Sequence, residues 1–378
     1  MRRILAAFIV AVFAGLFIGG CVEDGPAVGS DVRIVVINVG KADSVLVQLR
    51  DKNYLIDTGT EDSVPALFAA LGICGVKHID GLFLTHMHSD HIGGLQGVLS
   101  GYPVGTMYRA DIAYESDKNL SETQELAAQY AVDYIPLWSG DSVEVADGIS
   151  FEVLAPLSVS GNDNDNSLVL RLRADGKTYM FTGDMQIDEE LTLLGSDCDL
   201  AADFLKVGNH GNPDATSNSF ANAVHPQIAV ISTDTEVDSD SANIRVYNAL
   251  TYADVYCTED YEYGVSVTVS EAGEFVVSDL SPGPGYLDVS VEPDFDSGIV
   301  YITNNSDAAD LSGCIVYEDS KDRYVVFPPG TMLERGERIT VGGRDSGADI
   351  CSDKKNFIKD DSTVYLYDKY GNVCGQKG

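Results

Sequence analysis

The apolar and polar positions along the first three quarters of the chain follow two kinds of spacing. Short runs rich in β-branched residues predict strands, and apolar residues three and four positions apart predict helices. The predicted strands cover residues 32–39, 44–49, 53–57, 81–85, 143–154 with a turn at 147–148, 167–173, 178–182, 204–207, 227–232, 253–257 and 264–269. The predicted helices cover residues 64–71, a segment that starts at 92, 120–132, 187–194, 220–224 and 243–250. Strands that lead into helices, twice over, predict two packed sheets with helices on the outside.

The last quarter of the chain has another pattern. Ser281-Pro282-Gly283-Pro284-Gly285 is the clearest linker in the sequence, because proline and glycine interrupt regular elements. Beyond it, short strands separated by turn residues are predicted at 287–291, 298–303, 324–327, 338–341 and 362–367. This pattern is typical of a small β-sandwich. We therefore expect a first domain over residues 32–278, a linker over 279–285 and an all-β domain over 286–378.

The first residues predict export from the cytoplasm. Two arginines precede an apolar run over residues 4–18, and small residues follow, which is the layout of a secretory signal. The ending Ile18-Gly19-Gly20-Cys21 resembles a lipoprotein signal, in which the cysteine is lipidated and becomes the new N-terminus. An uncleaved membrane anchor is the alternative, although the run is slightly short for one. Either way, residues 22–31 would tether an extracytoplasmic protein to the cell membrane.

The composition is that of a globular protein, but the charge is extreme. The chain has 378 residues, 44% of them hydrophobic and 22% charged, which argues against global disorder. Its formal net charge of −35 repels polyanions at long range, whereas nucleic-acid-binding proteins usually carry a basic face. A host that lives in high salt would also explain the acidity, and salt would screen the repulsion. The charge therefore weighs against a nucleic-acid substrate without deciding the question.

Six cysteines follow Cys21, three in each expected domain. An extracytoplasmic location permits disulfides, but this odd split argues against a fully paired framework within each domain. No two cysteines have the CxxC spacing, so a cysteine zinc site is not expected.

Four residues that can bind metal lie within six positions. They are His86, His88, Asp90 and His91, directly after the strand predicted at 81–85. His86 and His88 are two apart and can point the same way in an extended loop, while Asp90 and His91 stand at a helix start and can face a second position. Imidazole suits zinc, manganese or iron, and carboxylate adds charge. These three histidines are half of the six in the chain, which favours a metal site over ordinary loop histidines.

The pattern His-x-His-x-Asp-His after a short apolar strand resembles the signature of the metallo-β-lactamase superfamily. Over about residues 32–275, the sequence is similar to the extracellular hydrolase domain of the competence protein ComEC. The matching segments, in the order of that family, are 39–44, 55–59, 85–94, 164–170, 181–184 and 205–211. The resemblance implies a four-layer αββα fold of the α/β class and a metal-dependent hydrolase.

The resemblance also implies a centre with two divalent metal ions, zinc or manganese. The matching positions place His86 and His88 on the first metal, Asp90, His91 and His210 on the second, and Asp184 between the two. The metals would share a water or hydroxide, lower its pKa and neutralise charge in the transition state. Asp90 and Asp184 are the candidate catalytic carboxylates, and Asp90 is the candidate proton acceptor. For Asp184 and His210, the alternatives are an ordinary turn aspartate and an ordinary loop histidine.

Four more polar residues match positions beside these ligands, and the resemblance implies that they orient the ligands by hydrogen bonds. They are Asp43, Asp57, Asn166 and Asn209. For Asp57, the alternative is a turn residue before Gly59.

The chain departs from the family at three places. No histidine occurs between His91 and His210, where many members have one, so the first metal position is short of a protein ligand. We expect that position to bind metal weakly or only with substrate. Asn209 stands where the family often has a histidine, and it cannot shuttle a proton near neutral pH. An acidic stretch at residues 234–241 replaces a segment that often holds a histidine, which weakens the case for phosphodiester cleavage. His225 lies earlier and is expected to be structural.

Residues 286–378 resemble a lamin-tail domain, an immunoglobulin-like β-sandwich. The matching segments are 300–305, 310–313, 327–331, 333–337, 364–368 and 371–373. No catalytic cluster occurs in them. We expect a module that binds a cell-surface polymer, a protein or DNA, and a passive stabilising cap is the alternative.

The sequence thus favours a metal-dependent hydrolase anchored outside the cell membrane, with a phosphodiester or nucleic-acid substrate implied by the resemblance. A hydrolase of another class, acting on an ester, thioester or lactam, is the first alternative. The second is a protein without strong catalytic activity that binds metal weakly and uses its fold and tail as a surface adhesin.

Overall fold

The computed structural model describes residues 31–112, 118–281, 287–321, 323–359 and 362–377. The predicted lipoprotein signal with Cys21, the tether up to residue 30 and most of the predicted linker lie outside the described residues. Within the described part of the chain, no helix is long and apolar enough to cross a membrane. All six cysteines of that part are free.

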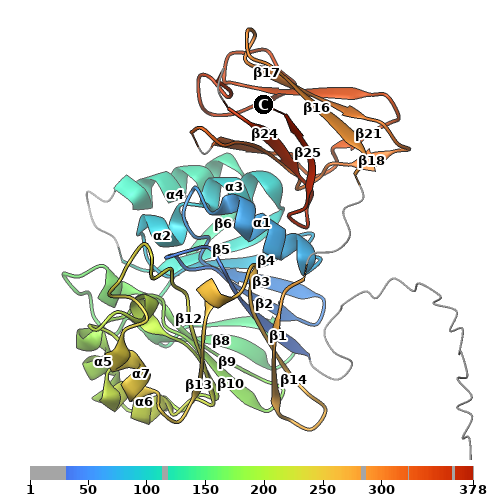
Figure 1. Ribbon diagram of the computed structural model, residues 1–378. Coiled ribbons are helices and arrows are strands. Elements are labelled where there is room, and N and C mark those ends of the chain that lie inside the picture. The colour runs from blue at the N-terminus through green and yellow to red at the C-terminus, as the bar shows by residue number, and fades with distance from the viewer. Residues whose placement is uncertain (1–30, 113–117, 282–286, 322, 360–361, 378) are drawn as a thin grey trace, which may run out of the picture.

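The first sheet has eight strands in the order β15-β14-β1-β2-β3-β4-β5-β6. Their bounds are Val32–Ile37 (β1), Val45–Leu49 (β2), Lys52–Ile56 (β3), Ile79–Leu84 (β4), Val104–Ala110 (β5), Asp133–Leu137 (β6), Gly264–Val269 (β14) and Phe275–Asp279 (β15). The helices on its outer face are α1 (Val64–Ile73), α3 (Leu95–Gly101) and α4 (Lys118–Gln129), as Figure 1 shows. β3, β4, β5 and β6 are parallel neighbours, so their carboxyl ends open onto the same edge of the sheet.

The second sheet has seven strands in the order β13-β12-β11-β10-β9-β8-β7. Their bounds are Ser142–Ala146 (β7), Ile149–Ala155 (β8), Val169–Ala174 (β9), Lys177–Phe181 (β10), Phe204–Lys206 (β11), Ile228–Ile231 (β12) and Asp254–Cys257 (β13). The helices on its outer side are α5 (Ile187–Leu194), α6 (Asn218–Val224) and α7 (Ile244–Ala249), in Figure 1 at the lower left. β10, β11, β12 and β13 are parallel, so here too the carboxyl ends share one edge.

The two sheets pack face to face around an apolar core. Phe83 of the first sheet meets Phe151 of the second, with ring centroids 4.8 Å apart. The helices bury separate cores on the outer faces, with Phe68 of α1 in one and Phe220 of α6 in the other. The order helix, sheet, sheet, helix confirms the predicted four-layer αββα fold.

The apolar pattern failed to predict β5, β6 and β15. β6 is the outer strand of its sheet, contains Pro136 and exposes Asp133. An edge strand packs against only one neighbour and tolerates proline, so it lacks the continuous apolar run of a buried strand. β15 is the opposite edge and reaches Asp279, so the first domain extends one residue into the predicted linker.

The C-terminal unit is all-β, as predicted. It has two four-stranded sheets, β16-β17-β22-β23 and β20-β19-β24-β25, and a β18-β21 pair. The bounds are Val289–Asp294 (β16), Ile299–Asn304 (β17), Ala309–Asp310 (β18), Ile315–Glu318 (β19), Arg323–Val326 (β20), Met332–Leu333 (β21), Arg338–Gly342 (β22), Ile350–Cys351 (β23), Val364–Tyr367 (β24) and Val373–Lys377 (β25). Both larger sheets contribute to one core, in which Val300 and Ile302 lie with Val316 and Leu366. The immunoglobulin-like and lamin-tail assignments stay predictions.

The C-terminal unit packs against the helical layer of the first sheet (Figure 1). Ile315 of β19 and Val326 of β20 are buried in the same apolar core as Phe68 of α1. At the rim, Lys354 Nζ lies 3.1 Å from Glu61 Oε1. The two units therefore share apolar surface and are not joined by the linker alone.

Gly72→Ala should destabilise this interface. Alanine normally stabilises a helix by roughly 0.5–1 kcal/mol relative to glycine, but a Cβ at Gly72 would overlap the carbonyl oxygen of Lys369 in the C-terminal unit. We expect the free energy of unfolding, measured by urea denaturation of the full chain, to fall by about 1–3 kcal/mol. Gly195→Ala is the control, since a Cβ there would come no closer than 3.4 Å to another atom. A Gly72→Ala protein as stable as the parent would contradict the close approach.

Candidate metal centre

The candidate ligands come from loops at one edge of the two sheets, around α2 (Ser89–Ile92) in Figure 1. His86, His88, Asp90 and His91 follow β4 or lie in α2, Asp184 follows β10 and His210 follows β11. The carboxyl ends of parallel strands open onto a common edge, which is where α/β folds gather their functional residues. The loops after β3 and β1, with Asp57 and Asp43, reach the same place through hydrogen bonds described below.

The backbone is strained at this edge. Asp57, Asn209 and His210 have φ values of 62°, 44° and 53°, in the left-handed region that residues with a side chain seldom adopt. Gly183, directly before Asp184, has φ 51°, and a Cβ there would lie 2.9 Å from Thr85 Cβ. Such strain gathers at functional sites and persists only where the surroundings hold it. The turns that carry Asp184 and His210 are therefore fixed in place.

The structure brings together the four residues implied for the second metal. His91 Nε2 lies 3.2 Å from Asp184 Oδ2, and His210 Nε2 lies 3.4 Å from the same oxygen and 3.5 Å from Asp90 Oδ2. One ligand atom from each of Asp90, His91, Asp184 and His210 lies within 4.8 Å of the others. His91, Asp184 and His210 are buried, while the Asp90 side chain is 20% exposed. This set could hold one divalent cation with its open side at Asp90.

The first metal position is less complete. His86 is buried and its ring centroid lies 4.1 Å from that of His91. His88 has its ring 4.5 Å from that of His86, but its side chain is 44% exposed and its Nε2 lies 3.8 Å from Asp163 Oδ2. The two histidines are neighbours, yet neither belongs to the close group of four. The weaker first site stays a prediction.

Unsatisfied polar atoms show that the residues fit metal ions. Within the described part of the chain, His86 Nε2, His91 Nε2, His210 Nε2 and Asp184 Oδ1 are buried without a hydrogen-bond partner. A buried polar atom without a partner costs roughly 1–3 kcal/mol, so four in one place need an explanation. A metal ion bound by these nitrogen and carboxylate atoms would satisfy them, and imidazole with carboxylate is a donor set that zinc and manganese accept.

Burial and neighbouring charges shift the pKa values of His91, His210 and Asp184 in opposite directions. Burial alone would lower the pKa of His91, but Asp184 and Asp57 raise it well above its usual value. The pKa of His210 is raised to about 9, since Asp184 outweighs the effect of burial. In turn, His210 and His91 hold the pKa of Asp184 well below its usual range, although burial opposes this. For His86, burial together with the neighbouring His91 lowers the pKa well below the usual value.

Metal binding should therefore depend on pH. An imidazole must be neutral to bind metal, while the pKa of His210, raised to about 9, keeps this side chain protonated at pH 7. Zinc binding has to release that proton and also the proton of His91, whose pKa is raised well above its usual value. We therefore expect the affinity to rise at least about tenfold per pH unit between pH 7 and 9. Competition with a chromophoric chelator at several pH values measures the affinity. An affinity that stays constant over this range would show that His210 binds no metal.

Asp57 orients His91. Its Oδ1 accepts a hydrogen bond from Thr85 N at 2.8 Å, and its Oδ2 accepts one from Thr85 Oγ1 at 2.7 Å. The same Oδ2 lies 2.8 Å from His91 Nδ1, which leaves His91 Nε2 as the atom that faces the centre. A histidine ligand commonly has its second nitrogen fixed in this way. These hydrogen bonds could support the orienting role expected for Asp57, which stays a prediction.

Asn166 and Asn209 hold loops beside the centre. Asn166 accepts a hydrogen bond from Ser160 N at 2.8 Å and donates to Ser160 O at 3.0 Å. Asn209 donates to Asp214 Oδ1 at 2.9 Å. Their expected role in orienting the ligands themselves stays a prediction.

Two lysines at the centre were not expected. Lys206, at the end of β11, has a side chain that is 1% exposed, and its Nζ lies 2.6 Å from Asp43 Oδ2. The other carboxylate oxygen of Asp43, Oδ1, lies 3.5 Å from His210 Nδ1. Lys41 Nζ lies 3.1 Å from Asp90 Oδ2. The sequence signal for Lys206 was a charged residue in an otherwise apolar strand, which is rare without a buried partner. For Lys41, no such signal exists.

Comparisons with known proteins agree with this centre. The sequence profile of the "Metallo-beta-lactamase superfamily" matches residues 37–235, more than half of the 378 residues. "Competence protein ComA" of Neisseria gonorrhoeae is 32% identical over 207 residues, which are 54% of this chain and 27% of that protein. "Ribonuclease Z" of Bacteroides fragilis is 35% identical over 82 residues, 21% of this chain and 25% of that protein. The chain therefore spans only about a quarter of the length of these curated relatives.

Among solved structures, the metallo-beta-lactamase fold protein YhfI of Bacillus subtilis is 15% identical, with a TM-score of 0.40, over 66% of this chain and 100% of that one. The family assignment rests on the sequence match, which includes all six candidate ligands, His86, His88, Asp90, His91, Asp184 and His210. The chain belongs to the metallo-beta-lactamase superfamily, whose members are generally metal-dependent hydrolases.

Proposed function

We propose that this hydrolase cleaves phosphodiester bonds with divalent metal ions, zinc or manganese, and that its substrate is a nucleic acid or a related diester. The observation that carries the proposal is the convergence of four buried, unsatisfied ligand atoms from His86, His91, His210 and Asp184. The similarity to a competence protein and to a ribonuclease, by their names, supports this substrate class.

The arrangement of the residues supports hydrolysis. Metal ions held by these ligands would activate a water and stabilise negative charge on the substrate. Asp184 Oδ2 lies near the Nε2 atoms of His91 and His210, both at the second metal position. Its Oδ1 is buried without a hydrogen-bond partner and is the atom that could serve the first position. Asp90 is the partly exposed member of the set, so it faces the side from which a substrate arrives and can accept the proton of the attacking water.

Purified protein assayed on single-stranded DNA and on bis-p-nitrophenyl phosphate tests the proposal. We expect turnover of both that depends on added zinc or manganese and is lost in Asp184→Asn. Turnover of p-nitrophenyl acetate alone would point to a hydrolase of another class. Fewer than one equivalent of metal per chain, with no turnover, would favour a surface-binding protein without catalysis.

We also propose that the protein is attached to the outside of the cell membrane through a lipid on Cys21. The N-terminal pattern of residues 4–21 supports this location. Mass spectrometry of the protein from cells should show the added mass of the lipid, and Cys21→Ala should lose it. A parent protein without this added mass would contradict the lipid anchor.

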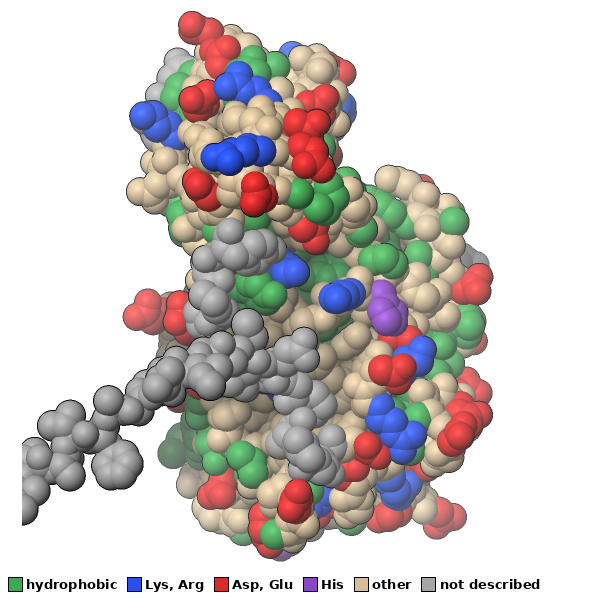
Figure 2. Space-filling model, turned by 90° about the vertical axis from the view of Figure 1, so that its right-hand side faces the viewer, with side chains coloured by type: hydrophobic (Ala, Val, Ile, Leu, Met, Phe, Trp, Pro, Cys, Tyr) green, Lys and Arg blue, Asp and Glu red, His purple; other side chains and the backbone are tan. Residues whose placement is uncertain are grey.

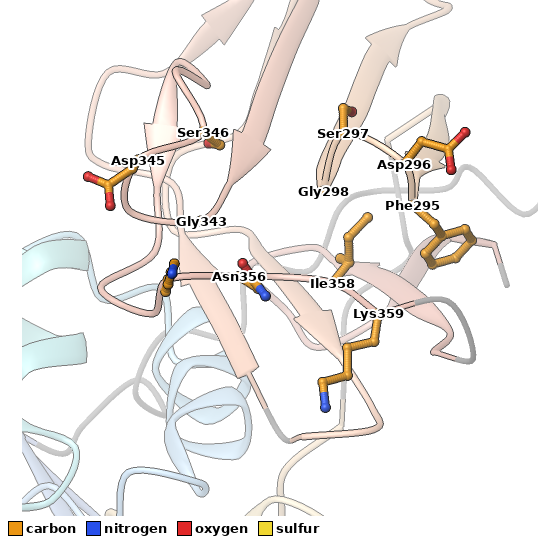
Figure 3. A pocket seen from close by; sticks show the side chains of 11 residues that line it. Phe295, Asp296, Ser297, Gly298, Gly343, Asp345, Ser346, Asn356, Ile358 and Lys359 are labelled. Carbon is orange, nitrogen blue, oxygen red and sulfur yellow. The ribbon is translucent and has the colours of Figure 1, made fainter.

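The C-terminal unit, which we take to be lamin-tail-like, is proposed to bind a cell-surface polysaccharide. A cavity of about 610 Å³ lies at one end of it, a volume within the range of small-molecule sites. In Figure 3, Asn356 and Ile358 lie between the 295–298 turn and the 343–346 loop. Four charged residues also line the cavity: Asp296, Asp345 and Lys359, which extend away from the middle in the same view, and Lys355. The amide of Asn356 and the hydroxyls of Ser297 and Ser346, with charged groups of both signs around them, can form the hydrogen bonds that a sugar requires.

Co-sedimentation of the full chain with purified cell-envelope polysaccharide tests this role. Asn356→Ala should reduce the bound fraction severalfold, whereas Asn222→Ala, an exposed asparagine of α6, should leave it unchanged. Equal binding by both variants would leave the C-terminal unit as a stabilising cap.

A further inference from the structure

We propose that Lys41 binds the anionic oxygen of the substrate at the metal centre and so determines its preference for negatively charged diesters. This inference rests on the proposed function and assigns a substrate-binding group at the metal centre.

A histidine could also hold a substrate phosphate, so we first consider the six histidines, all of which lie in the described part of the chain. Four of them belong to the metal centre. His78 Nε2 lies 3.0 Å from Asp80 Oδ2, and His225 stacks on Tyr252 with ring centroids 4.4 Å apart. Since each of these two has its own partner away from the centre, no imidazole remains to hold a substrate phosphate.

The surroundings of the centre are unfavourable to an anion. Asp163 Oδ2 lies 3.8 Å from Nε2 of the half-buried His88. Asn212, two residues after His210, donates a hydrogen bond to Asp238 Oδ2 at 3.4 Å. The loop with Asp238 is held against the His210 turn, because Ala242 N donates to His210 O at 3.0 Å. The face drawn in Figure 2 is the side of β1 and β14, away from α2, and there too basic side chains are interspersed with acidic ones. A phosphodiester would therefore need a local cation at the centre itself.

Lys41 is placed to be that cation. Its side chain is 25% exposed, whereas Lys206, the other lysine at the centre, is 1% exposed and paired with Asp43. The Lys41 partner, Asp90, is itself a candidate metal ligand, and one carboxylate cannot neutralise both a divalent cation and an ammonium group. Positive charge then remains at Lys41, on the open side of the centre.

The backbone that carries Lys41 is fixed. Asn38 Nδ2 donates to Tyr261 O at 2.8 Å, Asn38 Oδ1 accepts from Gly40 N at 3.2 Å, and Ala42 N donates to Gly40 O at 2.9 Å. Gly40 has φ 76°, which a side chain at this position would strain. A fixed turn lowers the entropy that the lysine loses when it binds a ligand, which favours affinity.

Three variants test the proposal: Lys41→Met, Lys41→Arg and, as control, Lys52→Met, a lysine that pairs with Asp80 at 2.7 Å away from the centre. Metal per chain is measured by elemental analysis, and affinity for inorganic phosphate by calorimetry on metal-loaded protein. KM and kcat are measured for anionic bis-p-nitrophenyl phosphate and for neutral p-nitrophenyl acetate.

We expect Lys41→Met to keep its metal and to bind phosphate about 10- to 100-fold more weakly, the effect of losing one hydrogen bond to a charged group. The KM for the diester should rise by a similar factor and that for the acetate should not change. Lys41→Arg should restore most of the phosphate affinity, and Lys52→Met should match the parent.

A loss of metal with equal losses on both substrates would overturn the proposal and leave Lys41 as a residue that only positions Asp90. Unchanged phosphate affinity in Lys41→Met would also overturn it. If the parent protein fails to cleave the diester, the proposed function falls, while the phosphate titration still decides the role of Lys41.

Discussion

Asp184→Asn is expected to remove the bound metal and not merely to slow turnover. Asp184 is buried, and its Oδ2 lies within 3.5 Å of the Nε2 atoms of both His91 and His210. Mutating a group that only orients a metal ligand commonly costs 10- to 100-fold in metal affinity. Loss of a charged ligand beside both of these histidines should therefore cost at least about 100-fold in metal affinity, and a similar factor or more in kcat/KM.

Asp188→Asn is the matched control for this variant. Asp188 is exposed in the first turn of α5, four residues after Asp184, so it undergoes the same chemical change outside the centre. Elemental analysis after gel filtration gives the metal per chain, and bis-p-nitrophenyl phosphate gives the rate. Full metal content in Asp184→Asn would show that the ligands lie elsewhere, and the assignment of the centre would fail.

Lys206→Met should be the most destabilising single change at the centre. Lys206 and Asp43 are both nearly inaccessible and lie 2.6 Å apart. Replacing the lysine leaves the carboxylate of Asp43 buried without its cation, and breaking a buried ion pair from one side costs about 3–5 kcal/mol. Lys52→Met breaks an ion pair whose lysine side chain is 45% exposed, and such pairs contribute only about 0–1 kcal/mol.

Urea denaturation of metal-free and metal-loaded protein measures this loss. The double variant Lys206→Met/Asp43→Asn should recover part of the stability, since an amide carries no buried charge. If the free energy of unfolding of Lys206→Met falls no further than that of Lys52→Met, the ion pair of Lys206 with Asp43 does not stabilise the position of Asp43 beside His210.

The ligands were predictable because most of them are close together in the sequence. His86, His88, Asp90 and His91 lie within six positions, and such a cluster of imidazoles with a carboxylate indicates a metal site. Lys206 and Asp43 are 163 positions apart, and no spacing rule connects them. Their pairing depends on β11 and the turn between β1 and β2 reaching the same edge, which only the packing of the two sheets determines. The strands with continuous apolar runs were predicted for the same local reason, while β6 and β15, at the sheet edges, have no such run.

The contact between the first domain and the C-terminal unit could not be predicted from the sequence either. Gly72 looked like the end of a helix, and it proved to be where the backbone of Lys369 approaches α1. A glycine that terminates a helix and a glycine that admits a neighbouring backbone have the same signature in a single sequence. Only the position of the C-terminal sheet distinguishes them.

The shared core at this contact has a consequence for how the protein unfolds. Ile315 and Val326 are buried with Phe68, and the segment from Asp57 to Glu61 runs from the residue that orients His91 to the ion pair with Lys354. Removing the C-terminal unit would expose the apolar face of α1 and α3 to water and weaken that segment. We therefore expect the regions on either side of the proline- and glycine-rich linker to unfold together in one cooperative transition. Shortened forms of the chain should then lose solubility before they lose any single ligand of the metal.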